Sequence, residues 1–74
     1  MDDLPEPHRL VVELEERRKH LGITADAMRR RAGVSSSTHW GWMKNGAPPS
    51  VSTLDRCNRA LDELAREAAS SAET

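Results

Sequence analysis

Two short helices with their own start and stop signals are predicted within residues 24–46, and this stretch limits the possible folds more than any other. Thr24 is a residue type preferred at helix N-caps, so we expect it to begin the first helix. Gly33 can adopt the left-handed conformation that ends a helix, and Ser35 is placed to cap the next one, which ends at Gly46. Two capped helices of this size around a glycine turn form a helix-turn-helix. In such a unit the second helix is the candidate for insertion into a DNA groove.

Apolar residues recur at helical spacing in the rest of the chain, and no alternating strand pattern is present, which predicts an all-α fold of four to five helices. Pro7 suits the first position of a helix, and Gly22 ends that helix. Within it, Glu13 with Arg17 and Glu15 with Lys19 have the i,i+4 spacing of surface ion pairs. The segment 46–49 contains two prolines and is a break that neither neighbouring helix can cross, so the last helix starts near Ser50 or Ser52. The predicted helices cover residues 7–20, 25–32, 36–44 and 52–69, between an acidic disordered arm at 1–6 and a disordered tail at 70–74.

The 74 residues are enough for one small domain, which we expect to be only marginally stable without a partner subunit. Two Trp and no Phe or Tyr are present, so the core must be largely aliphatic. No stretch approaches the roughly 20 apolar residues that a membrane span needs, and the acidic N-terminus is unlike a signal peptide. Cys57 is the one cysteine, which excludes an internal disulfide and agrees with a reducing cytosol. We therefore expect a cytoplasmic protein with no membrane association.

The charge is unevenly distributed along the chain. The formal net charge of −1 counts against nucleic-acid binding. Residues 9–44, however, contain eight basic and four acidic side chains, a balance of +4, while acidic side chains collect near both ends. Such a basic middle can bind phosphate on one face. The alternative is that these charges are ordinary solvated helix surface.

Short motifs follow one another in a fixed order between residues 10 and 61. They are a leucine-bearing first helix, Gly22-Ile23-Thr24, Ala32-Gly33-Val34-Ser35, Ser37-Thr38, Trp42, Pro49-Ser50, and a leucine-spaced helix from Leu54 to Leu61. This order resembles the lambda-repressor-like helix-turn-helix family of phage repressors, Cro proteins and Xre-type regulators. The resemblance implies a small helix-turn-helix domain that binds DNA as a transcriptional regulator.

The chain departs from this family pattern at three positions. Ala25 stands where the family often has a Gln that helps to grip a phosphate. Arg29 and His39 replace a small and a hydrophobic residue at the contact between the two helices. Burying either without a partner would be costly, so we expect Arg29 to place its guanidinium in water or on a carboxylate. His39 is expected to be half-buried and hydrogen-bonded rather than a switch or a ligand.

The resemblance places the outward side of the second helix of the motif against DNA. The matching positions, which occupy its exposed face, are Ser36, Ser37, Trp40, Gly41 and Lys44. Asn45 at the end of this helix and Arg30 on the preceding one are candidates for phosphate contact. Thr24 and Ser35 open helices whose free N–H groups can bind phosphate. No Arg, Gln or Asn lies at the front of the helix, so we expect specificity to depend on DNA shape, backbone fit and half-site spacing.

Some of these residues also have a purely structural interpretation. Trp42 is expected to be a core residue rather than one that stacks on a base, because its family position faces inward. Trp40 is equally consistent with DNA contact and with surface packing. The three arginines at 29–31 span about 200° of helix surface, so they cannot all face one partner. Phosphate contact by one or two of them and plain solvation remain alternatives.

The main functional hypothesis is a transcriptional regulator, a repressor of phage or mobile-element type that binds double-stranded operator DNA as a homodimer. Its two recognition helices would enter major grooves about 34 Å apart. The expected dimerisation residues are Leu61, Leu64, Ala65 and Ala68. The alternative is an antitoxin or adaptor that binds a protein partner through the same scaffold. The absence of strong base-reading residues and the near-zero net charge favour this alternative.

An enzyme is not expected from this sequence. The three histidines, His8, His20 and His39, lack metal-ligand spacing, and the acidic residues are explained as helix-surface charge. Cys57 lies on the apolar stripe of the last helix, where a core thiol is commoner than a redox sensor. We therefore predict no catalytic residue, no metal and no cofactor.

Overall fold

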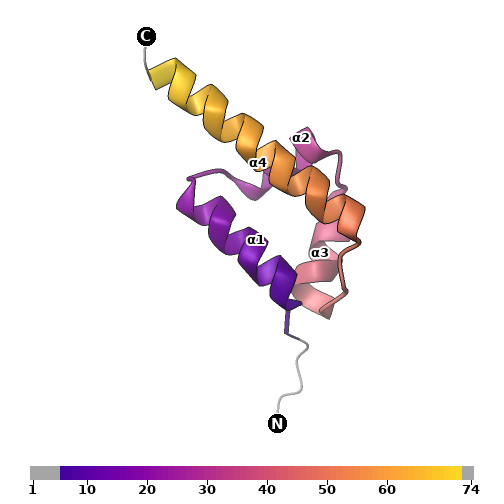
Figure 1. The fold of residues 1–74 in the computed structure, drawn as a ribbon. Helices are drawn as coiled ribbons and strands as arrows, with labels where there is room; N and C mark the ends of the chain where they lie inside the picture. Colours follow the sequence, from indigo (N-terminus) through magenta and orange to yellow (C-terminus); the bar gives the residue numbers. More distant parts are fainter. Residues whose placement is uncertain (1–5, 73–74) are drawn as a thin grey trace.

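The computed structural model describes residues 6–72, which form four helices and no strand (Figure 1). The helices are α1 (Arg9–His20), α2 (Ala25–Ala32), α3 (Ser36–Asn45) and α4 (Val51–Ala72). The predicted all-α fold is thereby confirmed. No helix within the described part of the chain is long and apolar enough to cross a membrane.

The two helices of the central motif begin and end at the residues expected from their caps. The Thr24 hydroxyl accepts a hydrogen bond from the Ala27 backbone N–H at 3.1 Å, and the Ser35 hydroxyl accepts one from Thr38 N–H at 3.1 Å. These bonds satisfy N–H groups that the first turn of a helix leaves unpaired. Gly33 follows α2 with φ +72°, in the left-handed conformation that glycine adopts without steric cost.

The outer helices differ from the prediction at their ends. α1 starts at Arg9 instead of Pro7, because His8 Nδ1 accepts from Leu10 N–H at 3.1 Å and so acts as the N-cap. The start of α4 is capped by Ser50, whose hydroxyl accepts from Thr53 N–H at 3.2 Å, and not by Ser52. Residues 70–72, predicted as part of a disordered tail, continue α4. The remaining predicted tail, 73–74, and most of the predicted arm, 1–5, lie outside the described residues.

A small core lies where the four helices meet. Its buried apolar residues are Val11, Leu14, Met28, Ala32, Val34, Trp42, Cys57, Ala60 and Leu61. Trp42 is 3% exposed, which confirms its predicted core position. Cys57 is also buried, and burial raises the pKa of its thiol, so it is an inert part of the core. The two largest side chains that are fully buried, Met28 and Leu61, come from α2 and α4.

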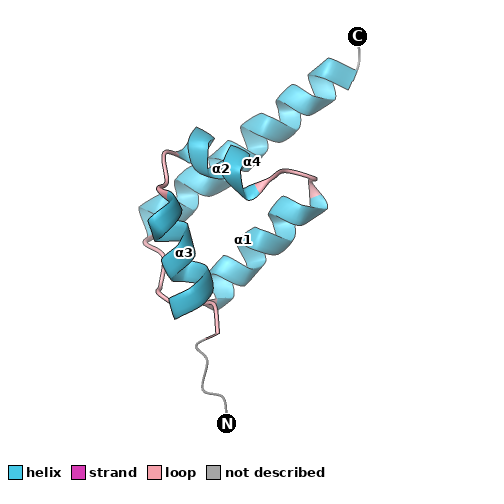
Figure 2. Ribbon diagram, turned by 180° about the vertical axis from the view of Figure 1, so that it is seen from behind, coloured by secondary structure: helices cyan, strands magenta, loops and turns pink. Residues whose placement is uncertain are grey.

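Two arginines hold the long helix α4 against the helices beside it. Arg17 on α1 donates to Asn58 Oδ1 at 2.8 Å and forms an ion pair with Asp62. Arg31 on α2 donates to both carboxylate oxygens of Glu67, at 2.6 and 2.8 Å, and the bidentate geometry adds directional specificity. The C-terminal turns of α4 continue past the other helices (Figures 1 and 2). At about 1.5 Å per residue the helix is about 33 Å long.

The ion pairs of α1 join other partners than those predicted from i,i+4 spacing. Glu13 was expected to pair with Arg17, and Glu15 with Lys19. Arg17 instead reaches α4, and Glu13 lies 3.8 Å from Arg9. Glu15 turns inward and pairs with Arg18. One of the two predicted pairs is thus replaced by a contact between helices, and the other by a pair with a different residue of α1.

Candidate nucleic-acid interface

The outward face of α3 is formed by polar side chains and one large aromatic. Ser36, Ser37, Lys44 and Asn45 are exposed, and Trp40 is 57% exposed. Ser36, Ser37, Trp40 and Lys44 have the i, i+1, i+4 and i+8 spacing of one helix side. Asn45, at i+9, lies about 180° around the helix from Ser36. No acidic residue belongs to α3, so nothing on this helix repels a phosphate backbone. The structure thus brings Ser36, Ser37, Trp40 and Lys44 onto one accessible side of α3, and Asn45 is exposed at the C-terminal end of this helix.

Gly41 does not lie at the front of this surface, as the family mapping had placed it. A Cβ added to Gly41 would lie 4.0 Å from the Cβ of Ala47, so this position faces the segment that links α3 to α4. The backbone of this segment also donates from Ala47 N–H to the Gly41 carbonyl. Gly41 is therefore half-buried beside the connection between α3 and α4, and its predicted contact with DNA stays a prediction.

The side-chain oxygens of the two cap residues accept hydrogen bonds from their own helices. The Thr24 oxygen accepts from the backbone of its own helix. The Ser35 oxygen accepts from Thr38 N–H, and its hydroxyl also donates to Thr38 Oγ1 at 2.9 Å. The Ser35 O–H is therefore used within the molecule, whereas the Thr24 O–H can still donate to a phosphate. The backbone N–H groups at both helix starts are further donors.

Most of the positive charge in residues 9–44 is paired within the molecule. Asp26 lies 2.6 Å from Arg29 and 3.0 Å from Arg30, although the Arg30 side chain is 79% exposed. Arg29 thus rests on a carboxylate, as expected. Of the eight basic residues in this stretch, only Lys19 and Lys44 have no acidic partner among residues 6–72. The basic excess of the sequence is therefore not concentrated on α3, where Lys44 is the single cation.

Lys44 is expected to make a salt-dependent contact with DNA. Replacing Lys44 with alanine should reduce the slope of log affinity against log salt concentration by about one, because one phosphate contact is lost. The measurement is a titration of DNA binding at a series of salt concentrations. Arg66→Ala, on the distal part of α4, is the matched control and should keep the wild-type slope. An unchanged slope for Lys44→Ala would remove this residue from the interface.

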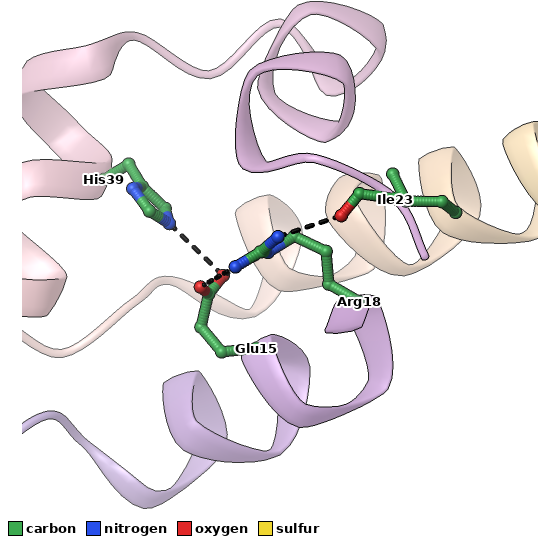
Figure 3. A network of polar contacts seen from close by, with 4 residues as sticks. All are labelled: Glu15, Arg18, Ile23 and His39. Carbon is green, nitrogen blue, oxygen red and sulfur yellow. Dashed lines mark hydrogen bonds and ion pairs between the residues drawn. The ribbon is translucent and has the colours of Figure 1, made fainter. Parts of the chain in front are cut away.

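A buried polar cluster lies beneath α3, formed by Glu15, Arg18, Ile23 and His39 (Figure 3). Glu15 is only 6% exposed. Arg18 donates to its two oxygens from Nη2 at 2.7 Å and from Nε at 3.1 Å, and also from Nη1 to the Ile23 carbonyl at 2.8 Å. His39 Nε2 lies 3.2 Å from Glu15 Oε2. The predicted hydrogen-bonded environment of His39 is confirmed, and its ring also meets Trp42 edge-on at 5.9 Å between centroids.

Sequence reasoning missed Glu15 as part of this arrangement. The signal was present in its spacing, since Glu15 follows the core residue Val11 by four positions and therefore shares its side of α1. A carboxylate on an apolar helix side needs a partner, and Arg18 lies one turn further on. Burial by itself raises the pKa of Glu15, but hydrogen bonds from Arg18 and His39 outweigh burial, so the pKa lies below its usual value.

Acid should destabilise the protein through this carboxylate. The depressed pKa of Glu15 means that its contribution to stability is fully present above the ordinary glutamate pKa of about 4.3 and is lost as the pH falls through the lower folded-state value. Urea unfolding measured between about pH 7 and pH 2 should show this loss. In the Glu15→Gln variant the acid-dependent part should be smaller. An identical pH dependence of the two proteins would contradict the assignment.

The predicted dimerisation residues separate into two groups. Leu61 is fully buried in the monomer core, so its prediction as a dimer contact is wrong. Leu64 and Ala65 are half-buried, and Ala68 is exposed on the distal part of α4. Helical spacing placed all four on one stripe, but this stripe lies in the core only as far as Leu61 and leaves it within the next turn. Within residues 6–72 no cluster of His, Cys, Asp or Glu has the arrangement of a metal site.

Comparison with known proteins gives one consistent match. Two curated relatives, both named antitoxin HigA1, come from Mycobacterium tuberculosis strains CDC 1551 / Oshkosh and ATCC 25618 / H37Rv. Each is 38% identical over 66 residues, which covers 89% of this chain and 44% of the relative. Over these residues the chain is similar in sequence to antitoxin HigA1. It spans less than half the length of these relatives, no protein-family model matches it, and no solved structure matches it significantly.

Proposed function

We propose that this chain is an antitoxin-type regulator. Its lambda-repressor-like helix-turn-helix domain binds operator DNA through the outward face of α3, and the protein pairs with a toxin. It performs no catalysis and acts inside the cell, where both partners are found. The observation that carries this proposal is the accessible face of Ser36, Ser37, Trp40 and Lys44 on a capped helix, in a chain similar in sequence to antitoxin HigA1.

The geometry of α2 and α3 supports the DNA-binding part of the proposal. Both helices are capped by hydroxyl residues and separated by the left-handed Gly33, and the second presents an acid-free outer side. Serine hydroxyls and one lysine discriminate bases weakly. Recognition therefore depends mainly on backbone contacts, on the shape of the duplex and on Trp40, whose exposed indole can press on a thymine methyl or a sugar.

The sequence similarity supports an antitoxin in preference to a phage repressor. Both interpretations use the same scaffold, and the relatives carry the name antitoxin. The nearly neutral net charge and the internally paired arginines agree with a regulator whose DNA affinity is moderate. A homodimer formed through Leu64, Ala65 and Ala68 on distal α4 would present two α3 helices to successive major grooves about 34 Å apart. Sedimentation that shows a monomer at high concentration would exclude this dimer.

The DNA-binding part is tested by selecting bound sequences from a pool of randomised duplexes. We expect enrichment of a site with two-fold symmetry, and affinity that falls with salt. Ser36→Ala should change the selected preference only modestly, because hydroxyl contacts discriminate weakly. Ser52→Ala, at an exposed position on α4, is the control and should select the wild-type site. The absence of binding at low ionic strength would disprove this part, and complete loss of preference from Ser36→Ala alone would contradict the role given to DNA shape.

The antitoxin part is tested by co-expression with the product of the adjacent gene. If that product arrests growth when expressed alone, this chain should restore growth and co-purify with it. A Trp40→Ala variant that restores growth but no longer binds DNA would place toxin binding outside the proposed DNA contact. Continued arrest in the presence of folded wild-type protein would disprove the antitoxin interpretation and leave the DNA-binding one standing.

A further inference from the structure

The candidate recognition helix α3 makes few contacts with the other helices. The backbones of α2 and α4 lie close together, whereas α3 lies further from the other helices. Its inward side chains are His39, Trp42 and Met43, of which the last two make apolar contacts with the core. In the part of the chain from residue 6 to 72, the bond from His39 to Glu15 is the one hydrogen bond between an α3 side chain and another helix. A directional contact of this kind fixes an angle that apolar packing leaves softer.

The Glu15 carboxylate is itself held rigidly. Arg18 contacts both of its oxygens, so the carboxylate cannot turn away from His39 without breaking two charge-assisted bonds. The same guanidinium donates to the Ile23 carbonyl, directly before the Thr24 cap of α2. One arginine on α1 therefore locates the start of α2 directly, and it locates α3 through Glu15 and His39 (Figure 3).

We propose that Glu15 is a positioning residue for DNA recognition: through His39 it sets the rotation of α3 about its own axis, and hence the direction in which Trp40 and Ser36 meet the duplex. His39 and Trp40 are consecutive, so they are about 100° apart on the helix and any rotation moves both equally. A binding constellation tolerates only about 10–20° of misorientation. This proposal rests on the proposed DNA binding, and it assigns a role to a residue that does not touch DNA.

The test compares variants at the two ends of this contact. Glu15→Gln removes the negative charge that pairs with Arg18. His39→Leu removes the imidazole N–H donor and keeps an apolar side chain at this position. Each should weaken binding to the selected duplex by about tenfold, the effect of one lost charge-assisted contact, and should broaden the selected sequences. The double variant should have the same DNA affinity as the single variant that binds DNA less tightly, because both substitutions act through one contact. His39→Gln, which restores an N–H donor, should recover most of the affinity.

A purely structural role is separated from positioning by two further measurements. Affinities are determined at a temperature where urea unfolding shows every variant to be folded. Ala60→Gly, which lowers stability from the buried side of α4 without touching Glu15 or His39, should leave DNA affinity within about twofold of wild type. If Glu15→Gln fails to fold, the comparison of His39→Leu with His39→Gln decides the question alone.

The outcomes also distinguish this proposal from the function on which it rests. Wild-type protein that binds DNA while the Glu15 and His39 variants bind equally well would overturn the positioning role only. Additive losses in the double variant, or a His39→Gln protein as weak as His39→Leu, would also overturn it. A wild-type protein that binds no duplex would overturn both proposals.

Discussion

Replacing Trp42 with alanine is expected to lower the free energy of unfolding by about 3–5 kcal/mol, the range for large aromatic residues removed from a packed core. Trp42 is 3% exposed and is the one aromatic residue among the buried apolar side chains of residues 6–72. The cavity it leaves would be lined by small aliphatic groups that cannot collapse to fill it. Stabilities of single domains are typically about 5–15 kcal/mol, so this change removes a large part of the total.

The measurement is urea unfolding followed by far-ultraviolet circular dichroism. Trp40→Ala supplies a closely matched control, because it deletes the same side chain from the same helix at a 57% exposed position. We expect that control to change stability by less than about 0.5 kcal/mol, as is usual for surface substitutions. Trp40→Ala should instead weaken DNA binding, while the fold of this variant stays intact. Equal losses of stability for the two variants would contradict the core assignment.

Replacing Arg18 with alanine is expected to cost about 3 kcal/mol, because it leaves the carboxylate of Glu15 buried without its main partner. The two side chains are only 13% and 8% exposed, so solvent screens the lost interaction little. Glu15 would keep His39 as a partner, and the Ile23 carbonyl would lose its donor. Both lost contacts lie where α1 meets the start of α2, so we expect this junction to be weakened.

The pH dependence of the Arg18→Ala loss has a defined sign. In the wild type the pKa of Glu15 lies below its usual value. Removing Arg18 takes away the largest of the effects that lower this pKa against burial, so we expect the pKa to be higher in the variant, and protonation to lessen its loss of stability as the pH falls. The difference in stability between the two proteins should therefore be largest near neutral pH and shrink in acid. Lys19→Ala, at an exposed neighbouring position, is the control and should remain within about 0.5 kcal/mol of wild type. A difference that grows in acid would contradict the pairing.

Features encoded by neighbouring residues could be predicted from the sequence. The caps at Thr24 and Ser35 join atoms three residues apart, and the turn at Gly33 depends on a single backbone angle. Each is determined by local residue types, whatever the rest of the chain does. The inward position of Trp42 and the outward position of Trp40 followed from helical periodicity and from the family pattern.

Features that depend on the meeting of distant helices could not be predicted in this way. Arg17 was assigned to Glu13, one turn away, but its partners on α4 are more than forty residues away in sequence. Periodicity identified the apolar stripe that includes Leu61 but not the point at which the stripe leaves the core. Gly41 was placed outward because the path of the segment after α3, which returns over it, is not encoded in helical spacing. The candidate interface was therefore predicted as a helix face, while the cluster that supports it was not.

The placement of the two tryptophans has a practical consequence. One indole is enclosed and lies beside a histidine ring, and the other is solvated at the centre of the candidate interface. With no tyrosine or phenylalanine in the chain, all its intrinsic emission comes from these two groups. Substituting either one leaves a single fluorophore, so loss of tertiary structure and arrival of a ligand can be recorded separately, without an attached dye.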